Sequence, residues 1–62
     1  MAKPKFQNTQ TVYLKIDEEQ FAFMVTGIVL RPEDYFEYLI SDGTEEFLVR
    51  EAEITVEKQI VI

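Results

Sequence analysis

The chain has no cysteine, no histidine and no tryptophan, and it holds only two glycines and two prolines among 62 residues. Without cysteine there is no disulfide framework, and without cysteine or histidine the usual structural zinc sites cannot be built. The usual carriers of nucleophilic and acid–base chemistry at neutral pH are missing too. Two glycines also exclude a glycine-rich phosphate loop. We therefore expect a protein that is not an enzyme and holds no metal or cofactor.

A second absence is that of a long apolar run. The longest uncharged apolar stretch, residues 21–30, has about half the length that a membrane-spanning helix needs. A chain of this length forms one small domain, which buries only about 60% of the surface that its unfolded form exposes. With no disulfides and no charged-then-apolar leader at Met1, we expect a soluble, cytoplasmic protein that does not enter a membrane.

Charge is present in excess and is unevenly placed. All twelve carboxylates fall between Asp17 and Glu57, whereas the four lysines lie outside that stretch, and the formal net charge is −6. An acidic body repels phosphate backbones, which disfavours nucleic-acid binding and favours a protein partner with a basic surface. Three alternatives stay open: the charge only maintains solubility, the protein mimics nucleic acid to inhibit a DNA-handling protein, or the Lys3 and Lys5 tail binds nucleic acid weakly.

The pattern of apolar residues predicts an all-β domain. Residues 1–10 are polar around the isolated Phe6 and predict a flexible lead-in, so the domain is expected over residues 11–62. Period-2 alternation or enrichment in β-branched and aromatic residues predicts five strands. These strands cover residues 11–16, 21–30, 35–40, 45–50 and 54–62.

The connections carry their own signals. Asp17 to Gln20 predicts a turn, and Gly27, inside the long second strand, predicts a bulge or a sharp bend. The pair Asp42 and Gly43 predicts a tight hairpin with both central residues at positive φ. Residues 51–53 fit one turn of 3₁₀ helix. Five short antiparallel strands with these connections predict a small barrel that closes its own edges.

Three stretches carry a resemblance to a known fold: VTGIVLRP (25–32), YFEYLISDGTEEFLV (35–49) and VREAEIT (49–55). They resemble the Src-homology-3-like small barrels, which include Tudor and KOW-type domains and place a short 3₁₀ turn before the last strand. The order of these segments is also similar to that of small uncharacterised proteins of bacteriophages and bacterial prophages. The resemblance implies a fold and brings no catalytic residue with it.

The candidate functional residues are aromatic and acidic. Tudor domains hold methylated lysine or arginine in aromatic cages, so the resemblance makes Tyr13, Tyr35 and Tyr38 candidates for an exposed aromatic patch. In the alternative, the tyrosines only cover the edges of a core, which the phenylalanines form. That core would consist of Phe21, Phe23, Phe36 and Phe47. The candidate interaction surface comprises Tyr35, Tyr38, Glu45, Glu46, Glu51 and Glu53.

The last residues, 59–62, are more apolar than the end of a chain usually is. Such a segment has to be covered by another part of the protein or by a partner. They either pair with the first strand inside the barrel or add to the sheet edge of a neighbouring chain. The first arrangement predicts a monomer and the second a weak homodimer through the C-terminal strand.

Overall fold

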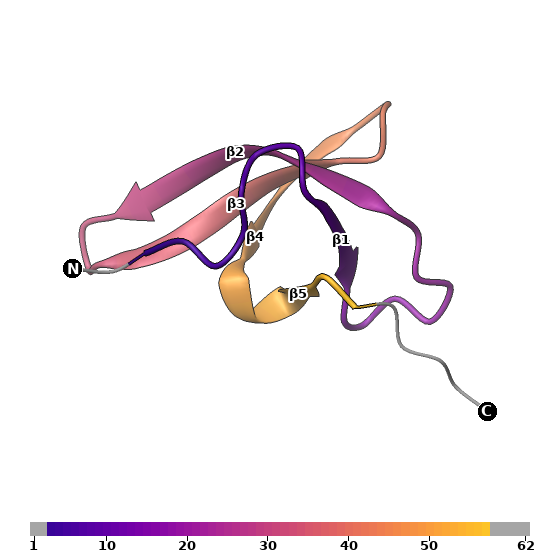
Figure 1. Cartoon of the computed structure of the whole chain (residues 1–62), viewed down its shortest axis with the longest axis horizontal. Helices are drawn as coiled ribbons and strands as arrows, with labels where there is room; N and C mark the ends of the chain where they lie inside the picture. The colour runs from indigo at the N-terminus through magenta and orange to yellow at the C-terminus, as the bar shows by residue number, and fades with distance from the viewer. Residues whose placement is uncertain (1–2, 58–62) are drawn as a thin grey trace.

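The computed structural model describes residues 3–57, which form one antiparallel sheet of five strands (Figure 1). The elements are β1 (Thr11–Leu14), β2 (Phe23–Arg31), β3 (Tyr35–Ser41), β4 (Glu46–Arg50), the 3₁₀ helix η1 (Glu51–Glu53) and β5 (Ile54–Thr55). The predicted all-β class and the 3₁₀ turn before the last strand are confirmed. No helix within residues 3–57 has the length and hydrophobicity needed to cross a bilayer.

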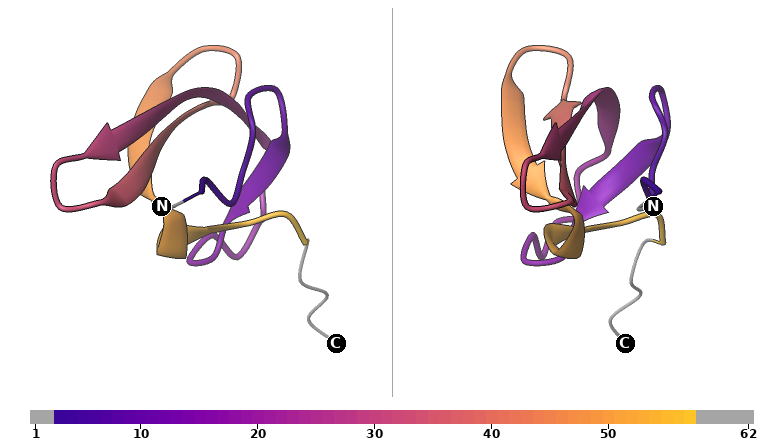
Figure 2. Two further views of the ribbon diagram at one scale, coloured as in Figure 1. Left: turned by 60° about the vertical axis from the view of Figure 1, so that its left-hand side comes forward. Right: turned by 90° about the vertical axis from the view of Figure 1, so that its left-hand side faces the viewer.

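The strand order is β4-β3-β2-β1-β5, and β2 joins the two halves of the sheet. Its first residues pair with β1, whereas almost its whole length pairs with β3. Figure 2 shows β2 and β3 curling together around the interior. Within the described residues β4 and β5 are the two ends of the sheet and do not pair with each other, so the predicted closed barrel is not observed. The 3₁₀ helix η1 leads from one end strand to the other, and β5 contributes only two paired residues.

A bulge interrupts β2 where the glycine predicted it. The register with β3 shifts between Val25 and Gly27, and the extra residue, Thr26, donates its hydroxyl to the Leu39 carbonyl (3.3 Å) and to Glu46 Oε2 (2.7 Å). A Cβ atom on Gly27 would lie 3.1 Å from Leu39 Cδ1. The glycine thus lets the Leu39 side chain lie close against the backbone of β2.

Among residues 3–57 the core contains eight buried side chains, drawn from every strand and from the N-terminal segment. They are Phe6, Val12, Phe23, Val25, Tyr38, Ile40, Val49 and Ile54. Of the four phenylalanines expected in the core, Phe23 is buried, and Phe36 is half-buried and packs against the core. Phe21 is 60% exposed and Phe47 is also exposed, so they were wrongly placed. Phe47 lies in β4, whereas Phe21 precedes β2.

The N-terminal segment belongs to the fold, contrary to the expectation of a lead-in that stands apart from it. Phe6 is buried and packs edge-on against Tyr38, with ring centroids 5.2 Å apart. Thr9 donates its N–H to the Val25 carbonyl (2.8 Å), and Val25 donates in return to the Gln10 carbonyl (3.0 Å). These bonds continue the pairing of β1 with β2 beyond the strand itself. A single aromatic residue in a polar segment has no periodicity that could have revealed this.

The strand ends differ from prediction where side chains form turns. β1 ends at Leu14, and Ile16 is 90% exposed instead of facing the core, because the Asp17 N–H turns back to the Leu14 carbonyl (3.2 Å). The predicted turn at residues 17–20 is present. The β3–β4 loop has only Gly43 at positive φ (102°), so the expected tight hairpin with two positive φ values is wrong.

Asp42 explains the wider loop. Its carboxylate accepts the backbone N–H groups of Thr44 and Glu45 (both 2.9 Å), and these bonds stabilise a four-residue connection between Ser41 and Glu46. At the other end of the chain, the expected strand over residues 54–62 begins at Ile54, and residues 58–62 lie outside the described part. The expectation for the apolar residues 59–62 lies there too.

Candidate functional site

The six residues of the predicted interaction surface do not form one surface. Tyr38 and Glu51 lie in a junction at the interior, Tyr35 and Glu53 flank Arg50, and Glu45 and Glu46 lie at the β3–β4 loop. Tyr38 is fully buried, so its assignment to an exposed aromatic patch is wrong. The signal was present in the sequence, since alternation places Tyr38 on the same face of β3 as Phe36 and the buried Ile40.

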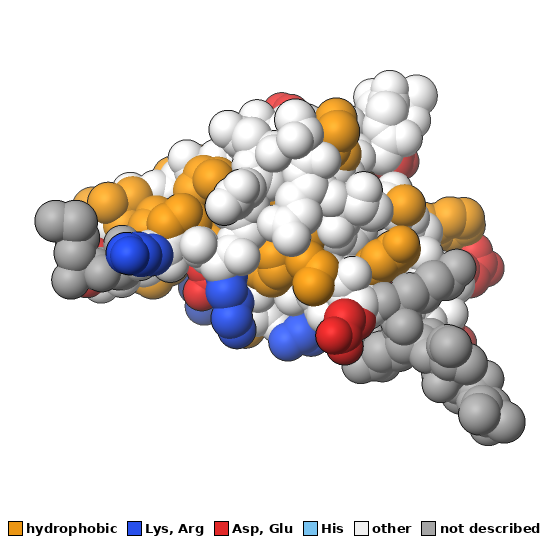
Figure 3. All heavy atoms as spheres, in the orientation of Figure 1, with side chains coloured by type: hydrophobic (Ala, Val, Ile, Leu, Met, Phe, Trp, Pro, Cys, Tyr) orange, Lys and Arg blue, Asp and Glu red, His pale blue; other side chains and the backbone are white. Residues whose placement is uncertain are grey.

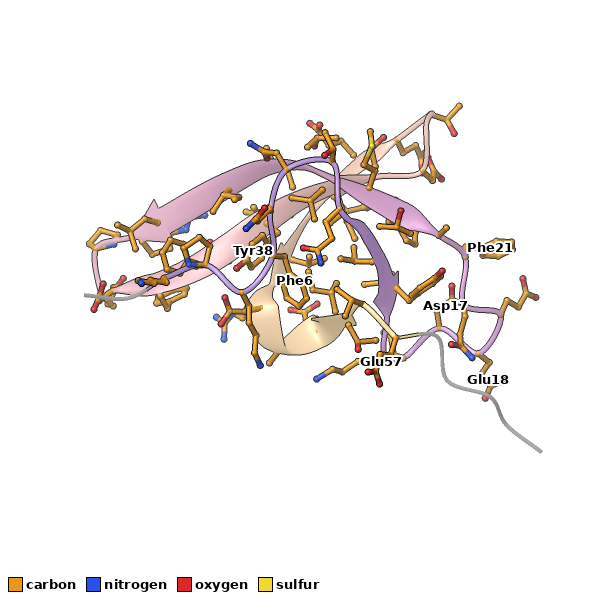
Figure 4. The ribbon with its side chains drawn as sticks, viewed as in Figure 1. Phe6, Asp17, Glu18, Phe21, Tyr38 and Glu57 are labelled. Atoms are coloured by element: carbon orange, nitrogen blue, oxygen red, sulfur yellow. The ribbon has the colours of Figure 1, made fainter. Side chains whose placement is uncertain are left out.

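The Tyr38 hydroxyl joins three separate segments. It donates to Glu51 Oε2 (2.6 Å) and accepts the backbone N–H groups of Lys5 (2.9 Å) and Phe6 (3.4 Å). The Lys5 N–H also donates to Glu51 Oε2 (3.1 Å). Figure 4 shows Tyr38 and Phe6 side by side in this junction. Burial, then the hydrogen bond to Glu51, raises the pKa of the Tyr38 phenol above its usual value. Tyr38 and Glu51 are therefore structural residues.

Tyr35 and Tyr38 do not converge into a cage. Tyr35 and Tyr38 are three residues apart in β3, so their side chains point to opposite faces of the sheet. The exposed Tyr35 ring already has a cation of its own chain above it, because the Arg50 guanidinium lies 6.0 Å from the ring centroid. Glu53 accepts the Arg50 backbone N–H (3.3 Å) and caps η1.

One groove does combine acidic and apolar groups. It has a volume of about 330 Å³ and lies where the end of the β1–β2 connection meets the β3–β4 loop. We call it the acidic groove; its lining residues are Thr11, Ala22, Phe23, Met24, Thr26, Ser41, Asp42 and Gly43. None of these side chains is basic. Glu46 is held at the groove by its hydrogen bond to Thr26, and Glu45 follows in the loop that begins at Asp42.

Asp42 keeps the rim of the acidic groove negative. Backbone hydrogen bonds from Glu45 and Thr44, followed by the Thr44 hydroxyl, lower the pKa of this carboxyl below its usual value. Next to it the apolar surface of Ala22 and Met24 is exposed. The sequence named Glu45 and Glu46, but it gave no indication of Ala22 or Met24, because the groove brings together segments that are far apart in the chain.

A second groove of about 340 Å³ has the opposite charge. Its lining residues are Lys5, Phe6, Gln10, Lys15, Ile54, Thr55, Val56 and Glu57. Figure 3 shows Lys and Arg side chains along the lower margin of this face of the molecule. Among the residues that the structure describes, no three acidic side chains gather as they would around a metal ion. Asp17 instead accepts the backbone N–H groups of Glu19 (3.1 Å) and Phe21 (3.0 Å) and so holds the β1–β2 turn.

No protein-family model matches the chain, and neither the curated proteins nor the solved structures gave a match. The resemblance to Src-homology-3-like barrels and to phage proteins therefore stays a prediction.

Proposed function

We propose that this protein is a small interaction module, built as a half-open barrel of the Src-homology-3-like kind, which binds a basic segment of a partner protein in the acidic groove. It acts by binding and not by catalysis. The observation that carries this proposal is the composition of the groove, whose lining combines the exposed apolar side chains of Ala22 and Met24 with the Asp42 carboxylate and has no basic side chain. A second carboxylate, that of Glu46, bonds to Thr26 of the lining.

The chemistry of the groove selects the kind of partner. When a partner side chain covers exposed apolar atoms, the free energy falls by about 25 cal/mol for each Å² removed from water. The rim carboxylates of Asp42 and Glu46 attract lysine and arginine and repel acidic segments. An extended peptide that alternates basic and apolar side chains meets both conditions. The formal net charge of −6 adds long-range attraction for such a segment.

A displayed library of random twelve-residue peptides, selected on the full chain, tests this function. We expect the enriched peptides to combine Lys or Arg with apolar residues. We also expect their binding to shift the amide NMR signals of Ala22, Met24 and Asp42. Enrichment of peptides without basic residues, or shifts confined to other regions, would contradict the proposal.

A matched pair of charge reversals locates the binding site. Glu45→Lys lies in the loop beside the acidic groove, whereas Glu33→Lys lies in the turn between β2 and β3, at the opposite end of these strands (Figure 1). Both variants have the same net charge. We expect Glu45→Lys to weaken binding of the enriched peptide by about tenfold and Glu33→Lys by about twofold, because only the first places a cation next to the bound one. Equal losses of affinity in the two variants would show that binding depends on the net charge and not on the acidic groove.

A further inference from the structure

β4 is an end strand of the sheet, and within the described residues no strand pairs with its outer edge. The right-hand view of Figure 2 shows β4 at the margin of the molecule. Leu48, in the middle of the strand, is 47% exposed, and its neighbour Phe47 is exposed as well. β4 contains no lysine, proline or bulge of the kind that usually blocks pairing at an edge. An uncovered edge with apolar side chains is a template for a further strand.

The sequence of β4 complements itself when it is reversed. If two copies of Glu46–Arg50 run antiparallel around a twofold axis at Leu48, Glu46 of each copy lies opposite Arg50 of the other. Phe47 then lies opposite Val49, and Leu48 lies opposite itself. The arrangement thus places two pairs of opposite charge at the ends of an apolar centre.

The faces of the strand match as well. Glu46, Leu48 and Arg50 alternate with Phe47 and Val49, so the two charged pairs and the Leu48 pair would share the outer face of the joined sheet. On the inner face, Val49 is buried opposite Tyr38, and Phe47 contacts Phe23 edge-on. Pairing of the two copies would therefore extend the apolar interior of each one across the axis.

The backbone N–H and C=O groups of β4 that do not bond to β3 also fit a twofold axis at Leu48. The Asp42 N–H bonds to the Glu45 carbonyl (3.3 Å), and alternation along the antiparallel ladder then makes Phe47 and Val49 the residues that bond to β3. Arg50 fits this pattern, because its N–H donates to the Glu53 side chain. The N–H and C=O groups of Leu48 therefore point to the open edge, and two Leu48 residues facing each other would exchange two hydrogen bonds.

We propose that a second copy of this chain pairs with β4, antiparallel and around a twofold axis at Leu48, so that two five-stranded sheets become one continuous sheet. This dimer uses β4 and not the C-terminal strand. The residues that line the acidic groove stay outside this interface, whereas Glu46 at its rim takes part in the end pairs. Dimerisation itself does not depend on the proposed function. The contact is short, so the dimer forms at high micromolar concentration.

Charge exchange tests the register. In sedimentation equilibrium at about 0.15 M salt, where repulsion between the acidic bodies is screened, we expect the native chain to dimerise. Glu46→Arg and Arg50→Glu should each weaken the dimer by about tenfold, because each sets like charges opposite one another in both end pairs. The double variant should restore it. The double variant still lacks the hydrogen bond between Thr26 and Glu46. Recovery of dimerisation would therefore come from the charge pairs between the two chains. A monomer at about 1 mM, or no recovery in the double variant, would overturn the proposal.

Cysteine cross-linking tests the axis independently. The chain has no cysteine, so Leu48→Cys introduces one thiol per copy. Hydrogen-bonded residues in antiparallel strands have Cα atoms about 5.5 Å apart, within the range of a disulfide. Under mild oxidation Leu48→Cys should form a disulfide-linked dimer much faster than Met24→Cys, a position with nearly the same exposure (46% against 47%). Equal rates for the two variants would overturn the proposed axis, and a thermal melt confirms that both fold.

Discussion

Tyr38 holds three segments together through one hydroxyl, which bonds to Glu51 and to the N–H groups of Lys5 and Phe6. Removing that oxygen leaves the buried Phe6 N–H without its acceptor. We expect Tyr38→Phe to lower the free energy of unfolding by about 1–3 kcal/mol in urea titrations. Tyr35→Phe is the matched control, because the Tyr35 side chain is exposed and its ring is retained; it should change stability by less than about 0.5 kcal/mol. Similar losses in the two variants would show that the junction contributes little.

The same phenol gives stability a dependence on alkaline pH. Because burial raises the pKa of Tyr38, the unfolded chain releases this proton at a lower pH than the folded chain does. The stabilisation that the protonated Tyr38 phenol provides is fully present below about pH 10 and is lost as the pH rises through the pKa of the folded state. Urea titrations between about pH 8 and pH 11 should show this loss, and Tyr38→Phe should show a shallower one. Identical slopes in the two proteins would contradict the assignment.

At the scale of the elements, two glycines serve different connections. Gly43 occupies the β3–β4 loop at φ 102°, where an L side chain is strained, so Gly43→Ala should lower the free energy of unfolding by about 1–2 kcal/mol. Gly27 in the bulge has no such φ, and an added Cβ would press only on the terminal Cδ1 of the half-exposed Leu39. Gly27→Ala should therefore change stability by less than about 1 kcal/mol. Thermal melts of the two variants compare them directly, and the reverse order would contradict this account.

The N-terminal segment is an element of the fold without being a helix or a strand. Phe6 is buried in the core and packs on Tyr38, so Phe6→Ala should destabilise the domain by about 3 kcal/mol or more. Phe21→Ala, at a position 60% exposed, should cost less than about 1 kcal/mol. Circular dichroism melts measure both. Equal melting temperatures for Phe6→Ala and the native chain would show that the segment does not support the core.

The elements could largely be predicted from local pattern, whereas their ends and their closure could not. Alternation is visible in residues 35–40 and 45–50, and Gly27 marks the bulge, because each signal lies within a few neighbouring residues. The end of β1 depends on a side chain, since Asp17 turns the chain before Ile16 can face the core. The absence of pairing between β4 and β5 within residues 3–57 has no signal in the local pattern, because the two strands are brought to the ends of the sheet by the pairing of all the others. The acidic groove was found only in part, because its apolar residues come from segments distant in sequence.

At the scale of the whole molecule, excess negative charge should make stability depend on salt. The formal net charge is −6, and within residues 3–57 only Arg31 and Glu37 form an ion pair. Because Glu37 is only 13% exposed, this pair is partly buried and salt screens it little, whereas salt relieves the repulsion among exposed carboxylates. We expect the free energy of unfolding to rise between about 0.02 and 0.5 M NaCl.

The double variant Glu18→Lys, Glu19→Lys is the control for the effect of salt. It changes two exposed residues of the β1–β2 turn and reduces the formal net charge from −6 to −2. Its stability should be higher than that of the native chain at low salt and should change less as salt is added. If the two proteins respond equally to salt, repulsion among carboxylates is not the cause.

The junction at Tyr38 also determines the order in which the molecule can be completed during synthesis. The Lys5 amide finds its Glu51 acceptor 46 positions later, and the Phe6 ring finds Tyr38 after 32. During synthesis residues 3–10 leave the ribosome before the strands do, so Phe6 emerges long before the surface that covers it. The hairpin of β3 and β4 can form as soon as its own residues are free, because its contacts are local. The segment before β1 therefore emerges ahead of the strands and yet is among the last to reach its place.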